Sequence, residues 1–126
     1  MERTLITGHS PFEGVAGFSR AVVVGDRVHV AGTAPIPPDG SSPPDGAYEQ
    51  AALCLEIIGE ALQRAGSGLA HVVRTNIYVT DAAHWAGVAR AHGEAFGDVR
   101  PAATCVVAQL LDPAWKVEIE AEAVIP

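Results

Sequence analysis

A helix followed by a β-strand is encoded by residues 47–79, AYEQAALCLEIIGEALQRAGSGLAHVVRTNIYV. Apolar side chains recur at every third or fourth position between residues 47 and 65, with charged side chains between them, which predicts an amphipathic helix. We expect Asp45 to cap the start of this helix and Gly66 to end it. Residues 72–79 then alternate as a strand does, and one face holds Val73, Thr75, Ile77 and Val79.

A β-hairpin is predicted ahead of this helix. Residues 20–24 and 27–32 are apolar runs separated by Gly25-Asp26, and a leading glycine suits the positive φ of a type II′ turn. Residues 3–6 are expected to add a first, shorter strand. The segment 33–46 carries five prolines, two glycines and two serines, which stop either regular structure from continuing. It is expected to be a loop within one domain, because the part before it is too short to fold alone.

The remainder of the chain predicts one more helix and two more strands. Asp81 is expected to cap the helix and Gly97 to end it. Its apolar stripe consists of Trp85, Val88, Ala89, His92 and Phe96. Strands are expected over residues 102–110 and 116–125. The predicted order is β-β-β-α-β-α-β-β, an α+β fold in which residues 1–126 form a single domain.

One sheet with two helices on one face leaves its other face uncovered. The strand patterns place many apolar residues on that face, and no further helix remains to bury them. We therefore expect a second copy of the chain to cover it, which predicts a homo-oligomer.

Composition excludes several classes of partner. The formal charge is −7, from 8 Lys and Arg against 15 Asp and Glu, and no basic block occurs. Neither nucleic acid nor an acidic membrane is expected to bind such a surface. No run approaches the roughly 20 apolar residues of a membrane span, and no signal peptide is recognisable, so the cytoplasm is the expected compartment.

Cysteine and histidine spacing predicts neither a disulfide framework nor a metal site. Cys54 and Cys105 lie in different predicted elements and form no CxxC motif. The five histidines are scattered, and His84 and His92 are eight positions apart, which is not a ligand pair on a helix. Both thiols are expected to be free, and no metal is expected.

Several segments together resemble the RidA family, also called YjgF. The signature is carried by residues 100–107, Arg-Pro-Ala-Ala-Thr-Cys-Val-Val, and 116–124, Lys-Val-Glu-Ile-Glu-Ala-Glu-Ala-Val. Upstream of it, residues 17–22, 30–32, 51–65 and 72–79 also occur in the order of the family, so the resemblance covers nearly the whole chain. It implies a chorismate-mutase-like fold, a homotrimer with small-molecule clefts between subunits, and no metal or organic cofactor.

The resemblance also implies an activity, with departures at the residues that would carry it. Family members of known chemistry hydrolyse enamines and imines derived from amino acids, releasing ammonia and a 2-keto acid. Their carboxylate-binding arginine corresponds here to Ala103, which offers no charge-assisted contact. Their cleft tyrosine, serine and asparagine correspond to Phe18, Ala31 and, with an uncertain register, Arg90.

Two positions of the cleft match the family. Glu118 corresponds to a glutamate that orients or activates water, and a carboxylate within reach of water is sound general-base chemistry. Cys105 corresponds to a cysteine near the ligand; lining the cleft is favoured over attack on the substrate, since no histidine partner is indicated. Thr104, between Ala103 and Cys105, is grouped with the substrate-binding residues.

Arginine elsewhere could replace the missing anchor. Arg20 follows Phe18 by two positions, and Arg90 lies on the second predicted helix near the expected cleft mouth. Each could bind an anion, and each could equally pair with surface carboxylates.

Three functions follow from this pattern. The first is an enzyme that acts on a small imine, enamine or related carbonyl compound through Glu118 and water. The second is a trimer that binds a small metabolite without catalysis. The third, ribonuclease activity, is the weakest, because the net charge repels RNA and no aromatic platform with basic residues is visible.

Overall fold

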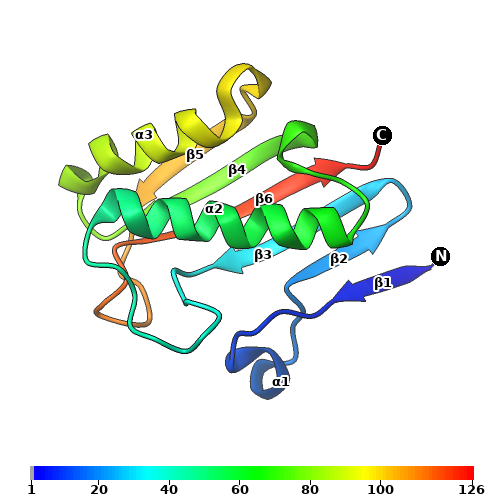
Figure 1. Ribbon diagram of the computed structural model, residues 1–126, viewed down its shortest axis with the longest axis horizontal. Coiled ribbons are helices and arrows are strands. Elements are labelled where there is room, and N and C mark those ends of the chain that lie inside the picture. Colours follow the sequence, from blue (N-terminus) through cyan, green and yellow to red (C-terminus); the bar gives the residue numbers. More distant parts are fainter. Residues whose placement is uncertain (1) are drawn as a thin grey trace.

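The computed structural model describes residues 2–126 and has one twisted sheet with its two long helices on the same face (Figure 1). The strands are β1 (Arg3–Ile6), β2 (Ala21–Val24), β3 (Arg27–Thr33), β4 (Val72–Val79), β5 (Ala102–Val107) and β6 (Val117–Val124). The helices are α1 (Phe12–Ala16), α2 (Ala47–Arg64) and α3 (Trp85–Phe96), and the 3-10 turns are η1 (Leu69–His71), η2 (Ala82–His84) and η3 (Gly97–Val99). The sheet order is β1-β2-β3-β6-β4-β5, with only β4 and β5 parallel.

The predicted α+β order is confirmed, with one helix that the pattern did not predict. The short helix α1 lies between β1 and β2 and buries none of its side chains, so it has no apolar stripe by which to recognise it. The predicted hairpin between β2 and β3 is present, and Gly25 at its turn has φ +60°, which suits a type II′ turn. The strand predicted over residues 102–110 ends at Val107, where its partner β4 also ends.

Two predicted helix caps differ from the structure. Asp45 does not cap α2, which starts after Gly46 with no side-chain hydrogen bond; instead the Asp45 carbonyl oxygen accepts from Lys116 Nζ. Asp81 caps the η2 turn, accepting a hydrogen bond of 2.8 Å from the Ala83 amide, and α3 begins only afterwards, at Trp85. Because Trp85 lies at this first position, it remains 45% exposed instead of joining the buried stripe.

A β-bulge in β4 overturns the predicted position of Val73. Val72 pairs with Ala123 and Arg74 with Glu122, so β4 uses two steps where β6 uses one. Val72 therefore faces the core, while Val73 is 43% exposed. The rest of the predicted face, Thr75, Ile77 and Val79, is buried as expected.

The face of the sheet away from α2 and α3 is less apolar than predicted. Its centre carries three polar pairs: Tyr78 donates to Glu120 at 2.6 Å, Arg74 donates to Thr104 at 3.2 Å, and His29 lies 3.8 Å from Glu122. Exposed apolar side chains lie toward the edge strands, with Leu5 57% and Val106 45% exposed. An oligomer contact is therefore expected to be apolar at the edges of this face and polar at its centre.

Gln50 fastens two loops to α2. Its side chain is buried, donates to the carbonyl oxygens of Pro44 and Ala114 at 2.8 and 2.9 Å, and accepts from the Lys116 amide at 2.7 Å. The loops that it joins, residues 33–46 and 108–116, wall the hollow described below. The Gln50 amide thus holds two loops in place that have no regular backbone hydrogen bonds to each other.

We expect Gln50→Met to lower the free energy of unfolding by about 3 kcal/mol, since it leaves three backbone groups unpaired in a buried position. Denaturation by urea at fixed protein concentration measures this loss. The control Gln63→Met changes an exposed glutamine of the same helix and should stay within about 0.5 kcal/mol. Equal effects of the two substitutions would contradict the role assigned to Gln50.

Candidate functional site

The Glu118 hollow is a cavity of about 410 Å³ at the end of the sheet where β2 and β6 begin. Its walls include Phe18, Arg20, Ala31, Glu118 and Trp115. The first four were selected from the sequence, and the chain brings them together although they lie up to 100 positions apart. Most of the lining is apolar, so the Glu118 carboxylate is set in a poorly solvated wall.

A bulge in β3 makes room for this carboxylate. Val30 pairs with Ala121 and Thr33 with Ile119, so β3 has one residue more than β6 over this stretch. Gly32 lies in the bulge, and a Cβ placed there would collide with Glu118 Oε2. A side chain at this position would push the Glu118 carboxyl group out of the place it occupies here.

Burial raises the pKa of Glu118 above the usual range of a glutamic acid. The positive charge of Arg20 opposes this rise, and the negative charge of Glu120 adds to it. A carboxyl group with a raised pKa keeps its proton to a higher pH than an ordinary glutamic acid does. Once ionised, its carboxylate is a stronger base than an ordinary glutamate. The group can therefore accept a proton from water and return it.

Arg20 is buried behind this wall, only 5% exposed. One of its terminal nitrogens donates to the Gly32 carbonyl oxygen at 2.5 Å, and its Nε has no hydrogen-bond partner among residues 2–126. The guanidinium carbon lies 6.0 Å from the ring centre of Phe18. Burial lowers the pKa of Arg20, while the carboxylates of Glu13 and Glu118 oppose that change. The buried guanidinium is thus flanked by two carboxylates and keeps N–H donors that no hydrogen bond within residues 2–126 uses.

Ala103 and Cys105 lie elsewhere in the chain, in the Cys105 hollow. This cavity of about 500 Å³ is walled by Ala103, Cys105 and Val106 of the edge strand β5 and by Trp85 of α3. Cys105 pairs with Ile77, a core residue, so its thiol is on the helix side of the sheet, whereas Glu118 is on the opposite side. Within one chain the two hollows share no wall residue.

Neither thiol has the environment of a nucleophile. Burial raises the pKa of Cys105, and burial also raises the pKa of Cys54, which is fully buried in the core. Both are therefore thiols rather than thiolates at neutral pH. This supports a lining role for Cys105 and a packing role for Cys54.

Thr104 and Arg90 lie outside both hollows. Thr104 is on the opposite side of β5 from Cys105 and accepts a hydrogen bond from Arg74. Arg90 is on the outer surface of α3, with its guanidinium carbon 3.7 Å from the ring centre of Tyr48. In the isolated chain neither residue reaches Glu118.

Sequence reasoning did not select eight of the twelve wall residues of the Glu118 hollow. Phe12, Trp115 and Leu111 come from α1 and the loop before β6, where no periodic pattern marks a position. Gly32 was identified only as the end of a strand. The prolines of the 33–46 loop were the one available signal, since a rigid loop beside a strand end often walls a binding site.

Within residues 2–126, His, Cys, Asp and Glu side chains form no group of three suited to hold a metal ion. In the same residues no helix has the length and apolar character that crossing a bilayer requires.

Comparison with known proteins identifies relatives of this chain in sequence and in structure. The model of the family described as Endoribonuclease L-PSP matches residues 8–125. The chain is 38% identical to an uncharacterized protein of Streptomyces coelicolor over 90% of this chain and 86% of the relative. It is 29% identical to the 2-iminobutanoate/2-iminopropanoate deaminase of Capra hircus over 98% of this chain and 90% of the relative. A crystal structure of a YjgF/YER057c/UK114 family member from Mycobacterium tuberculosis superposes with TM-score 0.89 at 42% identity, covering 98% and 100% of the two chains.

Proposed function

This chain belongs to the YjgF/RidA family, described also as Endoribonuclease L-PSP, and we propose that it hydrolyses a small reactive imine or enamine, releasing ammonia. The observation that carries the proposal is the Glu118 carboxylate, which lies in an apolar wall beside a buried arginine and has a raised pKa. The name of the Capra hircus relative, an iminobutanoate and iminopropanoate deaminase, supports the same chemical class.

Glu118 supplies both proton transfers of such a hydrolysis. In the first step a water oxygen forms a bond to the carbon of a protonated imine, the π electrons of the C=N bond move to nitrogen, and Glu118 accepts the proton that water loses. The product of this step is a neutral carbinolamine. In the second step Glu118 returns that proton to nitrogen, the C–N bond breaks as the hydroxyl oxygen forms the C=O bond, and the hydroxyl proton leaves with ammonia as ammonium.

Recognition of the substrate is expected to differ from that of an arginine-anchored relative. Ala103 contributes no charge, so a substrate carboxylate lacks a bidentate grip at that position. Arg20 is the nearest cation to Glu118 in the hollow and has unused donors. The preferred substrate is therefore a small imine or related carbonyl compound whose binding depends less on a carboxylate, and turnover of 2-imino acids is expected to be slow.

The complete cleft is proposed to form between subunits of a homotrimer. Glu118 and Cys105 face opposite sides of one sheet, so residues of both hollows can line one cleft only if two chains contribute. Exposed apolar side chains border the two hollows, with Trp85 45%, Val107 59% and Leu111 95% exposed. A neighbouring chain would cover them.

Native mass spectrometry at micromolar concentration is expected to give three times the chain mass of 13.0 kDa. Val106→Asp places a charge on an edge strand at the proposed contact and should produce monomer. The control Ala52→Asp changes an exposed residue of α2, on the helix-covered side of the sheet, and should leave the trimer intact. A monomeric wild-type chain would rule out both the assembly and the shared cleft.

Binding of a small metabolite without catalysis is the second candidate, and the Ala103 position favours it because the substrate anchor is absent. A bound ligand with no turnover of any imine would support this alternative. Ribonuclease activity finds no support in the charge, since −7 per chain repels the RNA backbone.

A further inference from the structure

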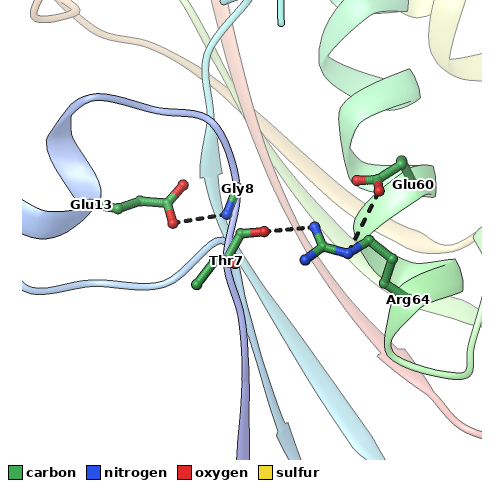
Figure 2. A network of polar contacts seen from close by, with 5 residues as sticks. All are labelled: Thr7, Gly8, Glu13, Glu60 and Arg64. Atoms are coloured by element: carbon green, nitrogen blue, oxygen red, sulfur yellow. Dashed lines mark hydrogen bonds and ion pairs between the residues drawn. The ribbon is translucent and has the colours of Figure 1, made fainter.

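The short helix α1 borders the Glu118 hollow, with Phe12 and Ala16 in the wall. None of its residues is buried, so apolar packing does not hold the helix in place. Its Glu13 carboxylate reaches back into the chain and accepts a hydrogen bond of 2.9 Å from the Gly8 amide (Figure 2). The other oxygen, Glu13 Oε2, is buried and has no hydrogen-bond partner among residues 2–126. An exposed helix thus places a charged atom in the interior.

The segment that receives Glu13 is held from its other side by α2. Arg64 donates to the Thr7 carbonyl oxygen at 2.6 Å, as Figure 2 shows. Gly8 has no side chain to separate Glu13 from Arg20. A Cβ at this position would lie 2.6 Å from Glu13 Oε2 and 3.1 Å from Cβ of Arg20. The carboxylate and the stem of the arginine therefore meet at Gly8.

Arg20 extends from one carboxylate to a second. Its stem lies at Gly8, and its terminal nitrogen donates to the Gly32 carbonyl oxygen at 2.5 Å. Glu118 lies at this second end, because a Cβ on Gly32 would collide with its carboxylate. Among residues 2–126 no hydrogen bond or ion pair joins Arg20 to Glu13 or Glu118. The arginine is only 5% exposed, so solvent screens its charge little.

The charge of Arg20 is stabilised mainly by Glu13. Arg20 Nε and Glu13 Oε2 are buried atoms of opposite charge, and neither has a hydrogen-bond partner among residues 2–126. Burial lowers the pKa of Arg20, and the carboxylate of Glu13 opposes this change more strongly than that of Glu118 does. The closer charge balance is therefore between Arg20 and Glu13.

We propose that Glu13 is a positioning residue for the hydrolysis, because its carboxylate retains the guanidinium of Arg20 and keeps it from pairing with Glu118. The inference rests on the proposed function, in which Glu118 carries the proton. A glutamate in a full ion pair with arginine would lose much of the basicity that burial gives it. Glu13 balances the buried arginine from its far side, and Glu118 remains an unpaired carboxylate in an apolar wall.

The other titratable groups near Glu118 do not replace this control. Burial raises the pKa of Glu118, Arg20 opposes the rise, and Glu120 of the same strand adds to it. Tyr78 of β4 and Cys54 of α2 also lie within range of its charge. Both are uncharged at neutral pH, because a hydrogen bond to Glu120 raises the pKa of Tyr78 and burial raises that of Cys54. Among residues 2–126, Arg20 is the positive charge that governs the basicity of Glu118.

Titration of the Glu118 carboxyl carbon by NMR in the wild type and in Glu13→Gln tests this role, with the signal identified by its loss in Glu118→Gln. Glutamine still accepts the hydrogen bond from the Gly8 amide but carries no charge, so the guanidinium can pair with Glu118. An opposite charge in contact lowers a carboxyl pKa by about 1 to 3 units, so the midpoint should fall by about 1 unit. The acidic limb of kcat/KM should move to lower pH with it. An unchanged or higher midpoint would overturn the proposal.

Two further variants show whether Glu13 acts through Arg20. Glu56→Gln removes the charge of an exposed glutamate of α2 and should move the midpoint by less than about 0.3 unit. The double variant Glu13→Gln/Arg20→Gln removes both buried charges together, so neither ion is left alone in the interior. Its midpoint should lie above that of the wild type, because no cation then opposes the effect of burial on Glu118.

Two results would contradict the role of Arg20 or of Glu13. A double variant with a midpoint as low as that of Glu13→Gln would show that Arg20 takes no part. A lower Tm of Glu13→Gln with an unchanged midpoint would make Glu13 a structural residue only. Because the titration needs no substrate, its result is independent of whether the chain hydrolyses imines.

Discussion

Glu118→Gln should remove nearly all imine hydrolysis, with kcat/KM falling about 10²- to 10⁴-fold, because an amide can neither accept the proton of the attacking water nor return it. The assay follows ammonia release from 2-iminopropanoate and from imines without a carboxylate, each generated in place. Glutamine is close in shape to glutamate, so its side chain fits the same space beside Gly32. A variant as active as the wild type would show that Glu118 is not the proton carrier.

The stability of this variant separates a chemical role from a structural one. Burial raises the pKa of Glu118 in the folded chain above its value in the unfolded chain, so the folded state binds the proton more tightly. The ionised carboxylate therefore costs stability, and this cost grows as pH rises through the interval between the unfolded and the folded pKa. At neutral pH, Glu118→Gln should melt at or above the wild-type temperature. A lower Tm together with unchanged turnover would assign Glu118 to structure.

The acidic limb of the pH profile reports the same group. Because the carboxylate is the active base, kcat/KM should fall as pH drops through the raised pKa of Glu118, above the ordinary glutamate value of about 4.3. The residual activity of Glu118→Gln should lack this limb.

Most of the fold was predictable because burial patterns are local. The alternation of β6 and the three- and four-residue spacing of α2 follow from which side chains face the core, and the structure confirms both. The position of Val73 was not predictable, because a bulge in β4 arises from pairing with β6, which is distant in sequence. Likewise Asp45 has the chemistry of a helix cap, but the backbone before α2 is held instead by Gln50 and Lys116.

The candidate site was predictable in part for the same reason. Phe18, Arg20, Ala31 and Glu118 are at or near strand ends, where topology fixes their neighbours, and they do converge on one hollow. The loop residue Trp115 could not be found, because its position depends on tertiary hydrogen bonds. The separation of Ala103 and Cys105 from Glu118 could not be found either, because it depends on which face of the sheet each strand presents.

The missing carboxylate anchor at Ala103 and the proposed cleft between subunits can be tested together. Ala103→Arg should raise kcat/KM for 2-iminopropanoate about ten- to a hundredfold, because it introduces a charge-assisted contact to the substrate carboxylate. In an isolated chain the new guanidinium would lie in the Cys105 hollow, away from Glu118. A gain therefore requires that it act on a cleft whose Glu118 belongs to the adjacent subunit.

Mixed trimers distinguish a shared cleft from a cleft within one chain. The double variant Ala103→Arg/Glu118→Gln has the anchor but no proton carrier, and the wild type has the reverse, so both homotrimers should be slow. If each cleft joins two neighbours in a ring, about three quarters of the trimers in an equal random mixture are mixed, and each mixed trimer has one complete cleft out of three. The mixture should therefore show about a quarter of the Ala103→Arg activity. If each cleft belonged to one chain, the mixture would show about half of the wild-type rate. The two chains are refolded together with different affinity tags, and the activity of the fraction that carries both tags is measured. A mixture slower than the wild type would contradict the shared cleft.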